Sequence, residues 1–403
     1  MEGWKEYKVG GVVNINSDSI TSGYPHKWIK YLDTSSVTDN IFHQPISLEL
    51  SKAPSRAKRI VKSNSILYST VRPNLRHFGY IKAASDNLIA STGFAVITGK
   101  PITDTRFLFY WLTQESIIKY LTALAEAQTT TFPAINPSEF SDLDIDLPPL
   151  PLQHRIAEIL GALDDKIELN RQMNQTLEHM AQALYKHYFV DDIDPENLPE
   201  GWRNGNVLEL ADLLSGGTPK TEIQEYWNGG IDWISAKDIT PNNKCFIVET
   251  GKKISPEGLA KSAAKLLPRY TTVITARGTV GNYCMLSREM AISQSNYGLK
   301  SKTGNSDFFI FQLVGNLVDK MKQQAYGTVF DTITTKTFQE LEIVIPPKEV
   351  IINFENVIKP LFELRLSTTF EVKNLSNIRD YLLPKLISGD FIPSALQTIE
   401  QAL

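Results

Sequence analysis

Two stretches of this chain decide its fold. Residues 131–150 read TFPAINPSEFSDLDIDLPPL, and residues 329–348 read VFDTITTKTFQELEIVIPPK. They align at an offset of 198 residues, which superimposes their Pro-Pro pairs. The same offset relates the tripeptide Gly-Trp-Lys at Gly3 to Gly-Trp-Arg at Gly201. A period this long is far beyond that of short helical or strand repeats, so the sequence predicts a tandem duplication of a whole domain with additional structure.

Shorter segments align in the same order between these anchors, with small shifts. The pairs are WIKYLDTSSV (28–37) with WISAKDITPN (233–242), ILYSTVRPN (66–74) with VITARGTVG (273–281), and IASTGF (89–94) with AISQSN (291–296). Each pair is weak by itself. Their shared order supports the duplication.

A long helix is predicted after each Pro-Pro pair. From Leu152 to Phe189, apolar residues recur at steps of four and three, which is the seam of a heptad repeat. At about 1.5 Å per residue this helix is roughly 55 Å long. A matching, less regular helix is predicted from Glu349 to Ile387, where Pro360 and Pro384 should kink it or end a turn. The predicted seam consists of Ile156, Leu160, Leu163, Ile167, Asn170, Asn174, Leu177 and Leu184, and of Phe354, Ile358, Leu361, Val372, Leu375 and Leu382.

Two of these seam positions are polar. Asparagine inside a coiled coil costs stability but fixes register and partner, as Asn170 and Asn174 would here. Two long heptad helices, one after each globular domain, favour a paired coiled coil. The alternative is that both helices pack in the core of one large domain.

The remaining sequence reads as two mixed α/β (α+β) domains. Short β-rich segments such as SILYSTV and TTVITA are separated by Gly, Pro, Asn and Asp. Residues 105–127 and 307–325 have the apolar spacing of amphipathic helices. The alternating run from Asp142 to Leu147 is typical of a half-buried strand and less so of a metal site. The predicted domains are 1–148 and 191–346, with spacer helices at 149–190 and 347–403.

Charge is distributed unevenly along the chain. The formal net charge is −4. However, residues 23–124 hold 13 Lys/Arg against 6 Asp/Glu, residues 126–168 hold 2 against 9, and residues 218–336 hold 15 against 10. Two basic globular zones therefore alternate with acidic helical ones. Because phosphate binding depends on local charge, the near-neutral total does not exclude a nucleic-acid partner.

The two cysteines, Cys245 and Cys284, make neither a disulfide framework nor a zinc spacing. The N-terminus does not read as a signal peptide, and no apolar run has the length of a membrane span. We therefore expect a cytoplasmic protein.

The order of these parts resembles the specificity (S) subunit of type I restriction–modification enzymes over essentially the whole chain. The most specific matches are LPPLPLQHRIAEIL followed by LDDKIELN, and RDYLLPKLISG near the C-terminus. The resemblance implies that each globular domain is a target-recognition domain for one half of a split, asymmetric DNA site. It implies that the long helices pair antiparallel with pseudo-two-fold symmetry, and that the localisation is the prokaryotic cytoplasm.

The resemblance also implies the partners. Two methyltransferase (M) subunits and the motor-nuclease (R) subunits would join the chain on double-stranded DNA. S-adenosylmethionine would belong to the M subunits, and ATP and Mg to the R subunits. This chain itself would then need no cofactor or metal and would have no catalytic residues.

Candidate DNA contacts in the first domain carry basic, amide or hydroxyl groups. The segment SKAPSRAKRIVK is a candidate phosphate clamp, although a solvated surface would look the same. Arginine suits guanine and asparagine suits adenine. Turn formation explains many Asn and Ser residues equally well. The candidates are Lys52, Arg56, Lys58, Arg59, Lys62, Arg72, Asn74, Arg76, Ser91 and Thr92.

The corresponding second-domain segments are SAKDI, TARGTVGN and SQSN. They supply the candidates Ser235, Lys237, Arg277, Asn282, Gln294 and Asn296. The hydroxyls of residues 129–131 could also meet phosphates, but a β-rich linker is favoured there. Trp4 and Trp202 are expected to anchor packing.

No enzyme motif stands out. The chain lacks GxxxxGK[ST], GxGxxG, HExxH and an Asn/Asp-Pro-Pro-aromatic motif. The alternatives left open are a self-contained nuclease or methyltransferase of unfamiliar sequence, a coiled-coil adaptor that does not bind DNA, and the specificity subunit of a methylation-only system.

Overall fold

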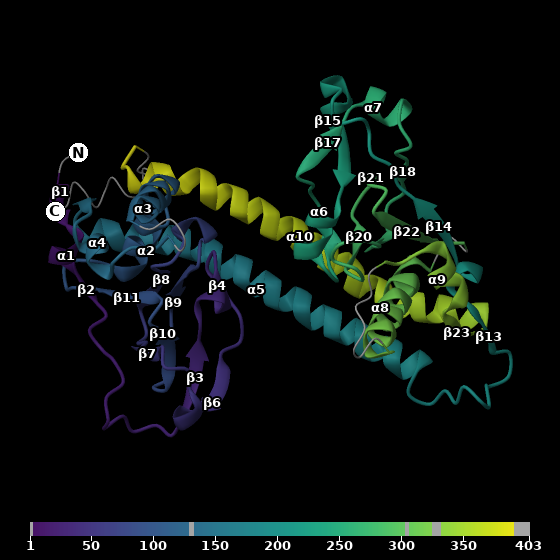
Figure 1. Cartoon of the computed structure of the whole chain (residues 1–403), viewed down its shortest axis with the longest axis horizontal. Helices are drawn as coiled ribbons and strands as arrows, with labels where there is room; N and C mark the ends of the chain where they lie inside the picture. Colours follow the sequence, from purple (N-terminus) through teal and green to yellow (C-terminus); the bar gives the residue numbers. More distant parts are fainter. Residues whose placement is uncertain (1–2, 129–132, 303–305, 325–331, 391–403) are drawn as a thin grey trace. The chain divides into compact units, whose positions relative to one another are not determined.

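The computed structural model describes residues 3–128, 133–302, 306–324 and 332–390 (Figure 1). The chain divides into two compact units. The first unit comprises Met1–Asp165 with Leu375–Leu403, and the second comprises Lys166–Asn374. The long helices are divided between them, so each unit holds a globular domain and a segment of both helices.

The globular domain of the first unit contains two four-stranded sheets. Their strands are β2 (Val13–Ile15), β3 (Trp28–Leu32), β6 (Ile46–Glu49), β7 (Ala57–Ile60), β8 (Ser65–Ser69), β9 (Phe78–Ile81), β10 (Leu88–Ser91) and β11 (Phe94–Gly99). The strand orders are β6-β3-β10-β7 and β2-β11-β8-β9. Two-stranded pairs are formed by β1 (Lys5–Lys8) with β12 (Asp144–Leu147) and by β4 (Val37–Thr38) with β5 (Ile41–Phe42).

The second unit repeats this plan. Its strands are β13 (Arg203–Asn206), β14 (Ala211–Ser215), β15 (Trp227–Ile234), β16 (Phe246–Ile247), β17 (Lys252–Ile254), β18 (Leu266–Leu267), β19 (Thr272–Thr275), β20 (Tyr283–Leu286), β21 (Met290–Ile292), β22 (Asn296–Ser301) and β23 (Glu342–Ile345). The orders are β17-β15-β21-β18 and β14-β22-β19-β20-β16, with a two-stranded pair of β13 and β23.

The two domains share one topology, which confirms the duplication. A parallel pair lies at the centre of one sheet in each unit, β3 with β10 and β15 with β21. The terminal pairs keep the offset of the repeat: Lys5 lies opposite Leu147, and Arg203 lies opposite Ile345. The acidic run forms β12, whose residues alternate between exposed and buried, as the sequence predicts.

Two of the predicted segment alignments are wrong in detail. In β8 and β19 the strand registers match Leu67, not Ile66, with Val273. A shift of one residue moves side chains to the other face of a strand, and only the shifted match places equivalent residues in the same core. Similarly, the pairing of β3 with β10 and of β15 with β21 matches Tyr31, not Trp28, with Trp233.

The shorter helices cover the sheets. Their bounds are α1 (Val9–Val12), α2 (Thr105–Leu112), α3 (Glu115–Gln128) and α4 (Pro137–Ser141) in the first unit, and α6 (Ala236–Ile239), α7 (Pro256–Ala260), α8 (Asp307–Gln324) and α9 (Thr335–Glu340) in the second. The single helix predicted over 105–127 is instead two helices, α2 and α3. The break lies at Thr113, whose hydroxyl donates to the carbonyl of Phe109 and competes with the helical pattern.

The long helices are α5 (Leu150–Phe189) and α10 (Lys348–Ile387), each of 40 residues. Their bounds differ by the repeat offset of 198. The expectation that Pro360 or Pro384 ends a turn is wrong, because α10 continues through both residues. Both prolines are exposed, so the backbone carbonyls that they leave unpaired can meet water, while apolar neighbours hold the helix in place.

The two helices form an antiparallel coiled coil, as seen in each unit separately. In the first unit, Leu160 of α5 shares a core cluster with Leu386 of α10. In the second unit, the ring of Tyr185 lies 6.0 Å from that of Phe354. All the predicted seam residues are buried or half-buried. Asn170 is completely buried, and no hydrogen-bond partner for its amide is found within the described part of the chain.

Each domain is joined to its helix segments by one continuous apolar core. In the first unit it includes α2, α3 and both helix segments. In the second it includes α8 and both helix segments. Trp202 packs on Phe189 with their ring centroids 6.2 Å apart, as expected of a packing anchor, and Trp4 is half-buried.

Candidate nucleic-acid interface

The basic segment of the first domain connects β6 to β7, the two edge strands of one sheet, and continues through β7. Lys52 ends a 3-10 turn, Arg56 lies in the following loop, and Lys58 and Arg59 lie on edge strand β7. The side chains of Lys52, Arg56 and Lys58 are exposed. They are therefore placed where a phosphate backbone could reach them.

Three cations of this segment have intramolecular partners. Lys52 lies 3.9 Å from Glu49, three residues earlier in the chain. Lys62 lies 2.9 Å from Asp18, and this hydrogen bond holds the pKa of the Asp18 carboxyl below its usual value. Arg59 donates to the hydroxyl of Ser19 at 3.4 Å. The contacts of Lys62 and Arg59 connect residues 18 and 19 to β7 and to the segment that follows it, so both side chains would have to exchange partners to bind DNA.

A tight turn follows β8 in the first domain. Arg72 and Arg76 both adopt positive φ, on either side of a 3-10 turn at Pro73–Leu75. Arg72 and Asn74 are exposed. Arg76 forms ion pairs with Asp39 at 3.2 Å and with Glu115 at 3.1 Å, so its guanidinium already binds two carboxylates.

The two remaining first-domain candidates lie after β10. Ser91 is 2% exposed, and its hydroxyl accepts a hydrogen bond from the backbone of Gly93. Its position supports a structural role in this turn and gives no support to the predicted DNA contact. Thr92 is exposed.

Four second-domain candidates come together around one open cleft of about 650 Å³. Ser235 and Lys237 lie at the start of α6, Arg277 follows β19, and Gln294 follows β21. The cleft therefore lies at the carboxyl ends of two strands, one from each sheet, and at the start of a helix. Lys237, Arg277 and Gln294 are exposed.

The cleft is basic, and its lining is mostly apolar. Lys252 lies in it, 5.3 Å from the ring centroid of Trp227, and adds a third cation to Lys237 and Arg277. The carboxylate of Asp238 also lines the cleft, but it accepts hydrogen bonds from the backbone and hydroxyl of Ser235 and caps α6. The cleft therefore has the chemistry of a surface that meets phosphates and base edges.

The sequence did not single out Lys252 or Thr218, which lines the cleft and donates to Gln294. Thr218 follows a Gly-Gly pair, which signals a turn. Lys252 reaches the cleft only because β17 pairs with β15, and this pairing has no local signal in the sequence.

The last two candidates lie elsewhere. Asn282 is half-buried, and its amide lies 3.4 Å from the hydroxyl of Thr240. Asn296 is 1% exposed and donates to Ser293 and to the carbonyl of Ile234. The predicted base contact of Asn296 is therefore not supported by its position.

The hydroxyls of residues 129–131 lie outside the described residues. In the part of the chain that is described, no group of three or more His, Cys, Asp or Glu side chains is arranged to hold a metal ion. Among the described helices, none is long and apolar enough to cross a membrane.

Two copies of one mixed domain, each built onto a segment of an antiparallel helix pair, define a class of tandem-domain proteins. The family model for the type I restriction modification DNA specificity domain matches residues 1–179 and 199–355. The chain therefore belongs to the family of type I restriction–modification specificity subunits.

Individual relatives agree with this assignment. The type I restriction enzyme HindI specificity subunit of Haemophilus influenzae is 29% identical over 97% of this chain and 100% of that protein. The MjaIX specificity subunit of Methanocaldococcus jannaschii is 25% identical over 82% of this chain and 78% of that protein. The crystal structure of the type I S subunit from M. genitalium has a TM-score of 0.56 at 16% identity and covers 95% of this chain and 96% of its own, which supports the fold.

Proposed function

We propose that this specificity subunit reads a bipartite, asymmetric DNA site, with one globular domain for each half. The observation that carries the proposal is the repetition of one topology with different side chains at equivalent positions. Gln294 after β21 corresponds to Thr92 after β10. Equivalent domains can meet the two strands of a duplex in equivalent poses, and different side chains then read different bases.

The second-domain cleft is proposed as one reading surface. Arg277 suits the O6 and N7 acceptors of guanine, and Gln294 suits the N6 donor and N7 acceptor of adenine. Lys237 and Lys252 would bind the flanking phosphates. In the first domain, Lys52, Arg56 and Lys58 would do the same.

The chain is proposed to act through partners. It would recruit two methyltransferase subunits, which bring S-adenosylmethionine, and motor-nuclease subunits, which bring ATP and Mg. The chain itself would catalyse no reaction and would work in the prokaryotic cytoplasm. The length of the paired helices is proposed to set the spacing between half-sites, so that a matched insertion in both helices changes the gap and not the bases.

The test is to express the chain with its cognate methyltransferase subunit and to map methylated adenines across a host genome. A split, asymmetric motif is expected. Arg277→Ala combined with Gln294→Ala should relax one half of the motif and leave the other half and the gap unchanged. Lys336→Ala, which removes an exposed cation on α9 of the same unit, is the control and should leave the motif intact. A continuous motif, or a change in both halves, would contradict the proposal.

Purified chain alone provides the second test. It should bind DNA with salt-dependent affinity and neither cut nor methylate it. Each phosphate contact removed should reduce the slope of log K against log salt by about 0.9. Methylation by the chain alone would instead indicate a self-contained enzyme. A protein adaptor would be indicated if the purified chain showed no salt-dependent affinity for DNA and if Lys52→Ala, Arg56→Ala and Lys58→Ala left its binding unchanged.

A further inference from the structure

Two buried ion pairs connect the long helices, one in each unit. In the first unit, Arg379 Nη1 lies 2.8 Å from Asp164 Oδ1. In the second unit, Arg365 binds Glu178. The side chains of Asp164, Glu178 and Arg365 are 10% exposed or less, and Arg379 is 19% exposed. Both carboxylates belong to α5, and both guanidinium groups belong to α10.

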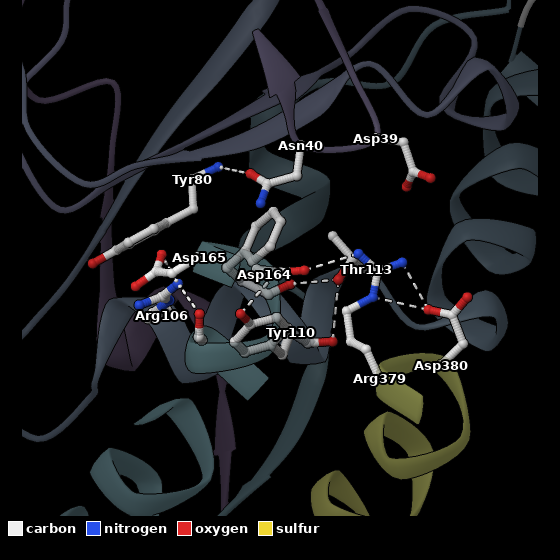
Figure 2. A network of polar contacts seen from close by, with 12 residues as sticks. Asp39, Asn40, Tyr80, Arg106, Tyr110, Thr113, Asp164, Asp165, Arg379 and Asp380 are labelled. Atoms are coloured by element: carbon white, nitrogen blue, oxygen red, sulfur yellow. Dashed lines mark hydrogen bonds and ion pairs between the residues drawn. The ribbon is translucent and has the colours of Figure 1, made fainter. Parts of the chain in front are cut away.

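The first pair is part of a network within the first unit. Figure 2 shows Asp164 between Tyr110 and Arg379. The hydroxyl of Tyr110 donates to Asp164 Oδ2 at 2.8 Å, and Arg379 also binds Asp380 on its own helix. Burial by itself would lower the pKa of Arg379, but the contact with Asp164 raises it. The carboxylate of Asp164 therefore depends on a cation that comes from the other helix.

The second pair is similarly enclosed. Glu178 accepts a hydrogen bond from Gln182 at 2.7 Å. Arg365 donates to the carbonyl of Lys244 at 2.8 Å, and its guanidinium lies 5.3 Å from the ring centroid of Phe362. Removing either partner of such a pair leaves an uncompensated buried charge, which is strongly destabilising.

The duplication shows which side chains would be buried together if α5 paired with α5 of a second copy instead of with α10. At the offset of 198, Arg379 corresponds to Ala181, and Arg365 corresponds to Ile167. If α5 of a second copy took the place of α10, Asp164 would face alanine and Glu178 would face isoleucine. Both carboxylates would then be buried without a cation.

Replacing α5 with α10 of a second copy would also leave buried charges without partners. Asp164 corresponds to Phe362 and Glu178 to Ser376, so two copies of α10 would bury Arg379 and Arg365 without carboxylates. Most other seam positions are apolar in both helices and do not distinguish one helix from the other. Buried ion pairs contribute little net stability, but they can specify the partner.

We infer that Asp164–Arg379 and Glu178–Arg365 are a matching code that selects α10 as the partner of α5 and rejects a second α5. The inference concerns helix pairing and does not depend on which DNA sequence the domains read.

Two full-length charge variants test the code. Variant A carries Asp164→Arg and Glu178→Arg, and variant B carries Arg365→Glu and Arg379→Glu. In variant A all four positions are arginines, and in variant B all four are carboxylates. Within either chain, α5 and α10 therefore repel each other at these positions. When A and B are mixed, α5 of each chain is complementary to α10 of the other. Co-refolding of differently tagged A and B should therefore yield at least tenfold more mixed dimer than co-refolding of two tagged wild-type chains.

Two further variants complete the experiment. A chain that carries all four substitutions restores both pairs with reversed sign, so it should fold and should form no more mixed dimer than wild type. Lys166→Glu reverses the charge of an exposed residue that pairs with Glu371 across the helices at 3.5 Å. It should also behave as wild type. The code is refuted if A with B gives no more mixed dimer than wild type, or if the fourfold variant fails to fold.

Discussion

The two units differ in the hollow where each domain meets its helix segments. In the first unit this hollow is about 40 Å³. The ion pair of Asp164 with Arg379 fills its polar side. The equivalent hollow of the second unit is about 160 Å³. The strand registers match Phe78 of the first hollow with Tyr283 of the second. The repeat offset matches Asp380 and Leu383 with Gln182 and Tyr185. Helices α2 and α8 begin 202 residues apart, which matches Tyr110 and Thr113 with Gln312 and Gly315.

The second unit has a cluster of aromatic rings between its helices in addition to the buried pair of Glu178 with Arg365. Tyr185, Phe189 and Phe309 surround Phe354, with ring centroids 4.9 to 6.2 Å away. In its hollow, Gln312 Nε2 is buried and, among the residues described, has no hydrogen-bond partner. The comparison teaches that one backbone arrangement tolerates two chemistries at the same junction, provided that each is internally complementary.

Removing the central ring of the second junction should have the largest effect. Phe354→Ala deletes a side chain that is 0% exposed and should destabilise the second unit by about 4 kcal/mol. The equivalent residue of the first unit is Ile156, and Ile156→Ala should cost about 3 kcal/mol because fewer contacts are lost. Hydrogen exchange of each unit measures both effects. Equal losses would mean that the aromatic cluster gives no special stability.

Breaking the polar junction of the first unit should have the next largest effect. Arg379→Met leaves Asp164 buried with only the hydroxyl of Tyr110, at a cost of about 3 kcal/mol or more. Lys373→Met is the control, because Lys373 and its partner Glu249 are both exposed, and it should change little. Protease susceptibility of the first unit reports the loss. A loss no greater than that of the control would show that Asp164 is not held by this pair.

The second unit should also respond to pH through Glu355. Its carboxylate accepts hydrogen bonds from the backbone of Phe308 and Phe309, but burial raises its pKa to about 7. The folded state then binds more protons than the unfolded state between about pH 4.5 and 7, so stability falls as pH rises through this window. The full effect is at most about 3 kcal/mol.

Denaturant unfolding of the second unit at pH 5 and pH 8 measures this slope. Glu355→Gln should flatten it, leaving the contribution of Asp307, whose pKa burial also raises. A slope that is unchanged in the variant would show that Glu355 is not its source. The first unit has Ala157 at the equivalent position, so its stability should lack this contribution.

The smallest effect should be the same in both units. Gly3 and Gly201 adopt φ of +85° and +79°, and an added Cβ would lie 3.1 Å from Pro149 and Pro347, respectively. Gly3→Ala and Gly201→Ala should each cost about 1 kcal/mol, since a side chain is strained at positive φ. Thermal unfolding should give matching shifts. Clearly unequal shifts would mean that the start of the repeat has diverged structurally as well.

Much of the architecture could be predicted from local signals. Proline pairs, heptad spacing and the repeat offset placed both long helices to within two residues, because a long periodic helix is set by its own sequence. The break at Thr113 and the continuity of α10 through Pro360 could not be predicted in this way. In both cases packing and hydrogen bonding with the rest of the unit override local propensity.

The candidate site could also be predicted only in part from the sequence. Its residue types could be predicted, since exposed Arg, Lys and Gln near turns are visible in the sequence. Which of them meet could not be predicted. Arg277 and Gln294 share a cleft with Lys252, whereas Asn296, two residues after Gln294, points inward. Alternation along a strand and pairing between distant strands decide this.

The sequence by itself determined the duplication, the two long helices and the family, because these depend on periodicity and order along the chain. Only the tertiary structure decided which polar residues lie in the cleft, and that the acidic residues Asp164 and Glu178 of one helix meet arginines of the other. The physical reason is that burial and charge pairing arise between segments about 200 residues apart, where no local pattern records the partner.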